Sequence, residues 1–378
     1  MRRLLAVLAL VAAPAHAQIA TPTQVKAAAD KAMADTGAKG LAIAVIDDGK
    51  VASVQAFGAR DAKGDPLAPD TVMYGASITK MVFGYYVMML VDEGKLKLDT
   101  PIASYLPKPL PEYGNLDAYG NWGDLAGDER WRKITPRIIL NHATGFANYA
   151  FVEPDEKLKF HFDPGSRFGY SGEGIILLQF VLEQGLGLDV GADLQRRIFT
   201  PLGMTRTSLK WRPDFAPNLA DGWDTAGKLT PHDERSRVRA SGSMDTTIGD
   251  LAKFAAAVVR GWGLSKAARA KFAKGTLPIT TRGQFPTLQP EAPPADRPNA
   301  KAAIGNVAFA GPQGPGFFKG GHDDTTGNTL VCVEKGRRCA LILSNDVRAE
   351  AAFPMLVRTI LGDTGVPYRW EYSGLKGW

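Results

Sequence analysis

Apolar residues near the two ends of the chain form short runs that are typical of β-strands. Residues 41–46 and 51–57 are two such runs, and Asp47-Asp48-Gly49-Lys50 between them contains the Asp-Gly pair of a hairpin turn. Similar runs near the other end cover residues 303–308, 317–319, 329–333 and 339–343. This pattern predicts one sheet that is built from both ends of the chain.

Longer apolar stretches have the length and composition of helices. Residues 78–93 are apolar on nearly every side and stop before Gly94, a residue that commonly ends helices. Such a helix is expected to be buried. Further helices are predicted at residues 23–34, 175–183, 251–259 and 351–361. From residue 275 to 300, Pro and Thr replace the periodic pattern, which predicts a long surface loop.

Strands at both ends with helices between them predict an α+β fold. Residues 18–94 and 301–378 would form a discontinuous lobe, with an antiparallel sheet flanked by helices. Residues 95–300 would form a mainly helical lobe inserted into it. At 378 residues, the chain exceeds the ~250–300 at which a single core usually stops growing. A substrate is expected in the cleft between two such lobes.

The first 17 residues have the pattern of a signal peptide. Two arginines precede an apolar run from Leu4 to Ala13, and Ala15-His16-Ala17 has the small-x-small form of a cleavage site. The run is shorter than the ~20 residues that span a bilayer. We therefore expect a periplasmic or secreted protein after cleavage near Ala17, without a stable membrane anchor.

The overall composition is that of an ordinary globular protein, with 45% hydrophobic and 22% charged residues. The net charge of +6 comes from scattered basic residues, so nucleic-acid binding is not expected. The histidines are too dispersed to predict a metal site, and nothing in the sequence calls for a cofactor. The expected partner is a small-molecule or peptide substrate, and the oligomeric state is left open.

The two cysteines, Cys332 and Cys339, flank a possible turn at Lys335-Gly336. A two-residue turn there would set them opposite each other on adjacent strands. An exported protein allows oxidation, so a disulfide fits the pattern. Two reduced, half-buried thiols also fit it, because another loop register would break the pairing.

Ser77-Ile78-Thr79-Lys80 is the first segment with catalytic potential. At this spacing the serine and lysine side chains share one helix face. A serine hydroxyl needs a base to become a good nucleophile, and a lysine can be that base when burial or nearby cations lower its pKa. The same spacing recurs at Ser373 and Lys376 in a glycine-containing tail, so the pattern alone is weak.

Two further segments could contribute to the same chemistry. Tyr170 lies just before a predicted helix, and a tyrosine beside a lysine can relay a proton. Lys319-Gly320-Gly321-His322 is a short strand whose glycines would let a substrate backbone lie close. Alone, a packed loop tyrosine and a surface strand would explain these segments as well.

In this order, the three segments resemble the family of class C β-lactamases, DD-peptidases and related esterases. That family has Ser-x-x-Lys, then Tyr-x-Asn or Tyr-Ser, then Lys-Thr-Gly or His-x-Gly. The resemblance extends from about residue 24 to 361. Other matching stretches are Gly94-Lys95-Leu96-Lys97-Leu98-Asp99-Thr100-Pro101, Ile139-Leu140-Asn141-His142-Ala143-Thr144-Gly145, Pro201-Leu202-Gly203-Met204, Ala240-Ser241-Gly242-Ser243-Met244 and Leu343-Ser344-Asn345.

The resemblance implies a β-lactamase/DD-peptidase-like fold and a serine hydrolase that acts through an acyl-enzyme. Ser77 would be the acylated nucleophile, and Lys80 and Tyr170 would handle its proton. Lys319 would occupy the Lys-Thr-Gly position, and the backbone N–H groups of Ser77 and His322 would form the oxyanion hole.

The remaining substrate-binding residues that the resemblance implies are Ser171, Gly320 and Gly321. Two positions depart from the family pattern. Gly172 replaces an Asn that grips a substrate amide, and Gly320 replaces a Thr whose hydroxyl helps to bind a carboxylate. Both losses predict a looser site.

The leading hypothesis for the substrate is a small amide or ester related to D-alanyl peptides or β-lactams. A short-chain carboxylesterase on the same fold is the alternative. A non-catalytic protein that binds penicillin or cell-wall fragments is an alternative of another class. An α/β-hydrolase with Ser171 as nucleophile is disfavoured, because Glu173 replaces the last Gly of the Gly-x-Ser-x-Gly pattern.

Overall fold

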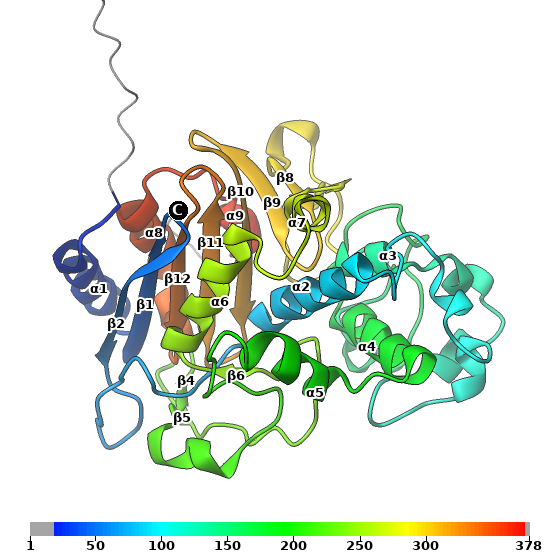
Figure 1. Ribbon diagram of the computed structural model, residues 1–378, viewed down its shortest axis with the longest axis horizontal. Coiled ribbons are helices and arrows are strands. Elements are labelled where there is room, and N and C mark those ends of the chain that lie inside the picture. Colours follow the sequence, from blue (N-terminus) through cyan, green and yellow to red (C-terminus); the bar gives the residue numbers. More distant parts are fainter. Residues whose placement is uncertain (1–18, 375–378) are drawn as a thin grey trace, which may run out of the picture.

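One antiparallel sheet, built from both ends of the chain, organises the computed structural model, which describes residues 19–374 (Figure 1). In spatial order its strands are β2 (Lys50–Gly58), β1 (Gly40–Asp47), β12 (Arg338–Ser344), β11 (Gly327–Val333), β10 (Gly314–His322), β9 (Val307–Gly311), β8 (Ala300–Ala302) and β7 (Leu277–Pro278). Because β12 pairs with both β1 and β11, it joins the N-terminal hairpin to the C-terminal strands. The predicted α+β fold class is confirmed.

Both faces of the sheet are covered by helices, which explains the continuous apolar runs in its strands. In β1, Leu41, Ile43 and Val45 pack in one hydrophobic cluster, and the alternating residues pack in the other. Helices α1 (Pro22–Thr36) and α8 (Phe353–Leu361) cover one face, and α6 (Ile248–Arg260) covers the opposite face (Figure 1).

Helix α2 (Ile78–Asp92) runs from the sheet into the helical part of the molecule, on the right in Figure 1. It contacts β10, β11 and α7 (Lys266–Ala273), and every residue from Ile78 to Leu90 is buried, as the sequence predicts. The other helices are α3 (Pro136–Leu140), α4 (Gly172–Leu186), α5 (Val190–Leu194), α7 (Lys266–Ala273) and α9 (Tyr368–Glu371). Two elements of the segment 95–300 belong with the sheet, since α6 packs on it and β7 pairs with it.

The predicted strand at residues 303–308 is wrong in its limits. Residues 303–306 form a turn between β8 and β9, where the Ala303 N–H donates to the Asn306 carbonyl (2.9 Å) and Gly305 has a φ of +70°. Two small strand pairs lie outside the main sheet. They are β3 (Met73–Tyr74) with β6 (Asp245–Thr246), and β4 (Gly222–Trp223) with β5 (Leu229–Thr230).

The cysteine pair takes the first of its two predicted forms. Cys332 and Cys339 lie opposite each other in β11 and β12 and are joined by a disulfide. The Arg337 N–H donates to the Glu334 carbonyl (3.0 Å), which closes the two-residue turn that the sequence predicts.

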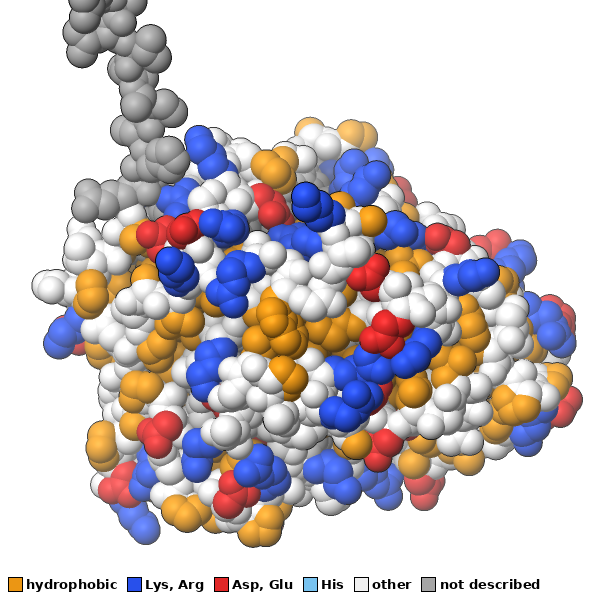
Figure 2. Space-filling model, viewed as in Figure 1, with side chains coloured by type: hydrophobic (Ala, Val, Ile, Leu, Met, Phe, Trp, Pro, Cys, Tyr) orange, Lys and Arg blue, Asp and Glu red, His pale blue; other side chains and the backbone are white. Residues whose placement is uncertain are grey.

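The predicted signal peptide, residues 1–17, lies outside the described residues, so export remains a prediction. Within residues 19–374, no single helix has the length and apolar character needed to cross a membrane. One sharply bent pair, Gly172–Leu186 with Val190–Phe199, passes that test by length and composition only. On the face shown in Figure 2, basic and acidic side chains are interspersed.

Candidate active site

Ser77 lies in a tight turn at the start of α2. The preceding residue, Ala76, has a φ of +45°, a left-handed conformation that residues other than glycine rarely adopt. Such backbone strain is concentrated at functional sites. Ser77 is partly exposed while the helix behind it is buried, so the turn presents its hydroxyl at the edge of the core.

Lys80 lies one helical turn further on and points at the Ser77 hydroxyl. Its Nζ donates to Ser77 Oγ (2.9 Å) and also to the Ser241 carbonyl. Neither contact supplies a negative charge, and the side chain is 1% exposed. Burial, together with the positive charge of Lys319, holds the pKa of Lys80 well below its ordinary value. The structure therefore favours a neutral amine that can accept the Ser77 proton.

Tyr170 and Lys319 complete the group around Lys80, as the sequence predicts. The Lys319 Nζ lies 3.4 Å from the Tyr170 hydroxyl, and the Lys80 Nζ lies 5.0 Å from the centre of the tyrosine ring. Burial raises the pKa of Tyr170 well above its ordinary value, while a hydrogen bond with Ser77 acts in the opposite direction. Burial lowers the pKa of Lys319 to about 8, although the charge of Glu371 counteracts this.

Ser171, predicted to bind substrate, is buried, and its side chain bonds to neighbouring backbone groups. Its hydroxyl caps α4 by accepting from the Gly174 N–H (3.1 Å) and donates to the Ala147 carbonyl (2.8 Å). Its backbone N–H donates to His142 Nδ1 (3.2 Å), and the His142 ring lies 4.3 Å from the Tyr170 ring. This network fixes Tyr170 beside the two lysines, and the binding of substrate by Ser171 remains a prediction.

Gly321 brings strand β10 against the nucleophile turn. A Cβ atom at Gly321 would lie 2.9 Å from the Ser77 backbone nitrogen and 2.8 Å from that of Ile78, so only glycine fits. This close approach places the strand beside the Ser77 N–H. The pairing of that N–H with the His322 N–H in an oxyanion hole remains a prediction.

At Gly172, the first position that departs from the family pattern, another side chain fills the space of the missing one. A Cβ atom at Gly172 would lie 2.5 Å from Cζ and the hydroxyl of Tyr149. The tyrosine ring therefore packs where the family's Asn side chain would begin. The Tyr149 hydroxyl donates to Ser241 Oγ (3.3 Å), next to the carbonyl that Lys80 contacts.

At Gly320, the second such position, a side chain of the C-terminal helix α9 fills the space of the missing one. A Cβ atom at Gly320 would lie 2.0 Å from Oε1 of Glu371, which is 3% exposed. Burial raises the pKa of Glu371, and the positive charge of Lys319 opposes that rise. The expectation of a looser site is therefore wrong at both glycines, because side chains from distant parts of the chain occupy the space.

His322 forms the rim of the site through its side chain. Its Nδ1 lies 3.3 Å from Oε1 of Glu350, and its ring lies 4.8 Å from that of Phe285, which also contacts the Tyr170 ring at 5.1 Å. Burial lowers the pKa of His322, but the hydrogen bond and charge of Glu350 outweigh this and raise it overall.

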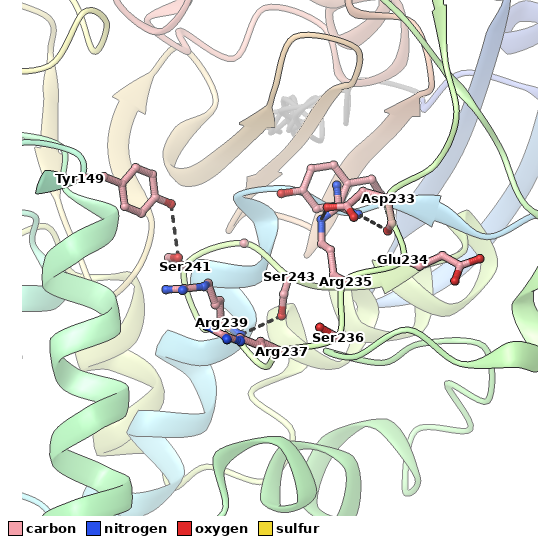
Figure 3. Close-up of a pocket in the computed structure, with 11 residues that line it drawn as sticks. Tyr149, Asp233, Glu234, Arg235, Ser236, Arg237, Arg239, Ser241 and Ser243 are labelled. Carbon is pink, nitrogen blue, oxygen red and sulfur yellow. Dashed lines mark hydrogen bonds and ion pairs between the residues drawn. The ribbon is translucent and has the colours of Figure 1, made fainter. Parts of the chain in front are cut away.

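A pocket opens on the Ser241 side of the site. It has a volume of about 370 Å³. Figure 3 shows Tyr149 and Ser241 at one end, with Arg237 and Arg239 below them and Asp233 and Glu234 toward the other end. Its lining residues are Tyr74, Tyr149, Asp233, Glu234, Arg235, Ser236, Arg237, Arg239, Ser241, Gly242 and Ser243.

Tyr149, Glu371 and Ser241 are not identified as residues of the site by the sequence alone. Tyr149 and Glu371 carry no pattern of their own, since their importance comes from packing against Gly172 and Gly320. Ser241 belongs to a stretch that resembles the family, which was the available signal for it. Within residues 19–374, no three His, Cys, Asp or Glu side chains are grouped as metal ligands.

Comparison with known proteins finds relatives that match part of the chain. One similar protein is monacolin J acid methylbutanoyltransferase from Aspergillus terreus, 29% identical over 202 residues, which are 46% of this chain and 48% of that protein. Another is lovastatin esterase from Penicillium rubens, 28% identical over 180 residues, 41% of this chain and 44% of that protein. The matched region thus spans about half the length of these curated relatives.

Solved structures and a family model extend the comparison over nearly the whole chain. D-alanine carboxypeptidase AmpC from Burkholderia cenocepacia is 17% identical, with a TM-score of 0.70 over 90% of this chain and 98% of that one. This likeness shows a shared β-lactamase/DD-peptidase-like fold. The family model described as Beta-lactamase matches residues 25–361. On that match and on the order of Ser77, Lys80, Tyr170 and Lys319, the chain belongs to the β-lactamase family.

Proposed function

We propose that this protein is a serine hydrolase that cleaves small esters through an acyl-enzyme on Ser77. The observation that carries the proposal is the 2.9 Å hydrogen bond between Lys80 Nζ and Ser77 Oγ, made by a buried amine without a carboxylate partner. The amine takes the serine proton as the hydroxyl attacks, and Tyr170 passes a proton to the leaving oxygen. Water then hydrolyses the acyl-enzyme and restores the serine.

Esters are favoured over the D-alanyl peptides or β-lactams of the leading sequence-based hypothesis. Tyr149 and Glu371 occupy the places where the family's amide-gripping Asn and carboxylate-binding Thr would lie. An ester depends less on such a grip, because its alcohol leaves more readily than an amine. The name of the relative lovastatin esterase supports the same choice.

The proposal is tested with p-nitrophenyl butyrate and a fluorescent penicillin, each followed by rate and by intact mass. We expect steady turnover of the ester, an acyl adduct on the wild-type protein, and loss of both in Ser77→Ala. The Ser77→Ala protein should keep the wild-type melting temperature. Hydrolysis or labelling that survives in Ser77→Ala would refute Ser77 as the nucleophile.

The same experiment separates the rival functions. Acylation by penicillin with turnover, and none by the ester, would favour the D-alanyl-peptide or β-lactam hypothesis. One equivalent of product without a steady state would favour the non-catalytic binding protein. We also propose that the protein works outside the cytoplasm, and N-terminal sequencing of the mature protein tests cleavage after Ala17.

A further inference from the structure

The pocket beside Ser241 contains two arginines, Arg237 and Arg239, that are held mainly by a backbone carbonyl, although the charge of Arg239 also acts to lower the pKa of the buried Glu173 carboxyl. Arg237 Nη1 and Arg239 Nη2 both donate to the Asp117 backbone carbonyl, at 2.9 and 3.3 Å. Among residues 19–374, neither forms an ion pair with an acidic side chain within 4.0 Å. A guanidinium held by a neutral carbonyl retains its positive charge and free N–H groups for a ligand.

The third arginine of the pocket is engaged differently. Arg235 Nη1 lies 3.5 Å from Asp245, its Nε lies 3.6 Å from Asp233, and its guanidinium packs 3.4 Å from the centre of the Tyr74 ring. Its charge is thus compensated within the fold. Figure 3 shows Arg237 and Arg239 together near Ser241, with Arg235 closer to Asp233.

The loop that carries the two arginines is held in place by hydrogen bonds. The Arg239 N–H donates to Ser243 Oγ (2.9 Å), and that hydroxyl donates to the Leu209 carbonyl (2.7 Å). Val238, between the two arginines, packs close to Gly191 of α5, and its carbonyl accepts from Gln179 Nε2 (3.1 Å). The side chains that could meet a ligand therefore stand on a fixed backbone.

This loop is in direct contact with the catalytic group. Lys80 Nζ donates to the Ser241 carbonyl, two residues beyond Arg239. Arg239 and Tyr149 also line a neighbouring cavity of about 510 Å³. The buried carboxyl of Glu173 lines that cavity and accepts from the Ala150 N–H (3.2 Å), and burial raises its pKa to about 7. Arg237 and Arg239 both line the pocket beside Ser241, and Arg239 also lines the neighbouring cavity.

We propose that the substrate carries a carboxylate that Arg237 and Arg239 bind in the pocket beside Ser241. This inference rests on the proposed ester hydrolysis and names its substrate class, an ester with a negatively charged group. An arginine fork matches the two oxygens of a carboxylate and forms strong charge-assisted hydrogen bonds. The pocket would thus supply the carboxylate recognition that Gly320 no longer allows on β10.

The test compares anionic and neutral esters of matched size. In the first pair, mono-p-nitrophenyl glutarate carries a carboxylate on its acyl side and p-nitrophenyl valerate is its neutral match. In the second pair, p-carboxyphenyl butyrate carries the carboxylate on its alcohol side and phenyl butyrate is its neutral match. In at least one pair we expect kcat/KM of the wild-type protein to be at least about tenfold higher for the anionic ester. The ratio of kcat/KM for the anionic ester to that for the neutral ester should fall toward one in the double variant Arg237→Gln/Arg239→Gln. The control Arg132→Gln, an exposed arginine paired with Glu129, should keep the wild-type ratio.

Binding of glutarate to the Ser77→Ala protein provides a readout that does not need catalysis. We expect saturable binding by calorimetry, lost when the two arginine substitutions are added and retained with Arg132→Gln. Absence of both an anionic preference and glutarate binding would overturn the anion site, even if neutral esters are hydrolysed. Glutarate binding without any Ser77-dependent hydrolysis would support the anion site and instead refute the proposed function.

Discussion

Gly320 and Glu371 provide the sharpest test of how this site is filled. A methyl group at position 320 would lie 2.0 Å from Glu371 Oε1, whereas ordinary van der Waals contact begins at 3.4 Å. Overpacking a buried position costs ~1–3 kcal/mol. Because a central strand and a buried carboxyl both resist movement, we expect Gly320→Ala to cost about 3 kcal/mol. At about 2 °C per kcal/mol for a chain of this size, its melting temperature should fall by about 6 °C.

A double-mutant cycle assigns this cost to the contact itself. Glu371→Ala removes the obstructing carboxyl, so in that background Gly320→Ala should cost less than about 1 kcal/mol, a coupling of about 2 kcal/mol. Urea unfolding of the four proteins, followed by circular dichroism, measures it. Gly374→Ala is the matched control, because a Cβ atom at Gly374 meets nothing within 4 Å. An equal cost of Gly320→Ala in both backgrounds would refute the reasoning.

Three further predictions follow from the site and its surroundings. Lys80→Met should lower kcat/KM for the ester by about 10²–10⁴-fold, and Tyr170→Phe by about 10²-fold, in initial-rate assays, since each removes a group that carries the serine proton; near-wild-type rates would contradict these roles. The pKa of Glu173 is raised from 4.5 to about 7, so the folded state binds the extra proton and stability should fall by up to about 3 kcal/mol as pH rises from 4.5 through 7. Glu173→Gln should lack this loss in urea unfolding at pH 5 and pH 8, and identical pH slopes would argue against it. Replacing Cys332 and Cys339, seven residues apart, with serine should cost about 2 kcal/mol in the same assay, because a short loop is no longer closed in the unfolded chain.

The strands and the buried helix could be predicted because their patterns follow directly from where they lie. Strand β1 is apolar at every position from Leu41 to Ile46, and both faces of the sheet around it are covered. The error at residues 303–308 has a local cause. Gly305 and Asn306 make a turn inside the run, and this Gly-Asn pair is the turn signal that the apolar residues on either side outweigh in the prediction.

The four residues around the reacting hydroxyl could be predicted from spacing and order, whereas their neighbours could not. Ser77 and Lys80 share a helix turn, which is a local relation that four letters of sequence encode. Glu371 lies on the four-residue helix α9 and reaches the site only through tertiary packing against β10. No local pattern connects it to Gly320.

Each of the two glycines that depart from the family pattern packs against one bulky side chain from elsewhere in the chain. At Gly172 the missing side chain is matched by Tyr149, and at Gly320 by Glu371, and in each case the glycine and its filler lie too close for any Cβ atom. A loss that appears to open the site in the sequence therefore closes it in the structure. The two changes also alter where charged side chains lie around the site. The chain places the Glu371 carboxyl beside Lys319 and holds the guanidinium groups of Arg237 and Arg239 by a backbone carbonyl near Ser241. Because the positive charge available to a ligand then lies on the loop before Ser241 rather than on β10, specificity should be altered by substitutions in residues 237–239 rather than by restoring the family's Thr at position 320.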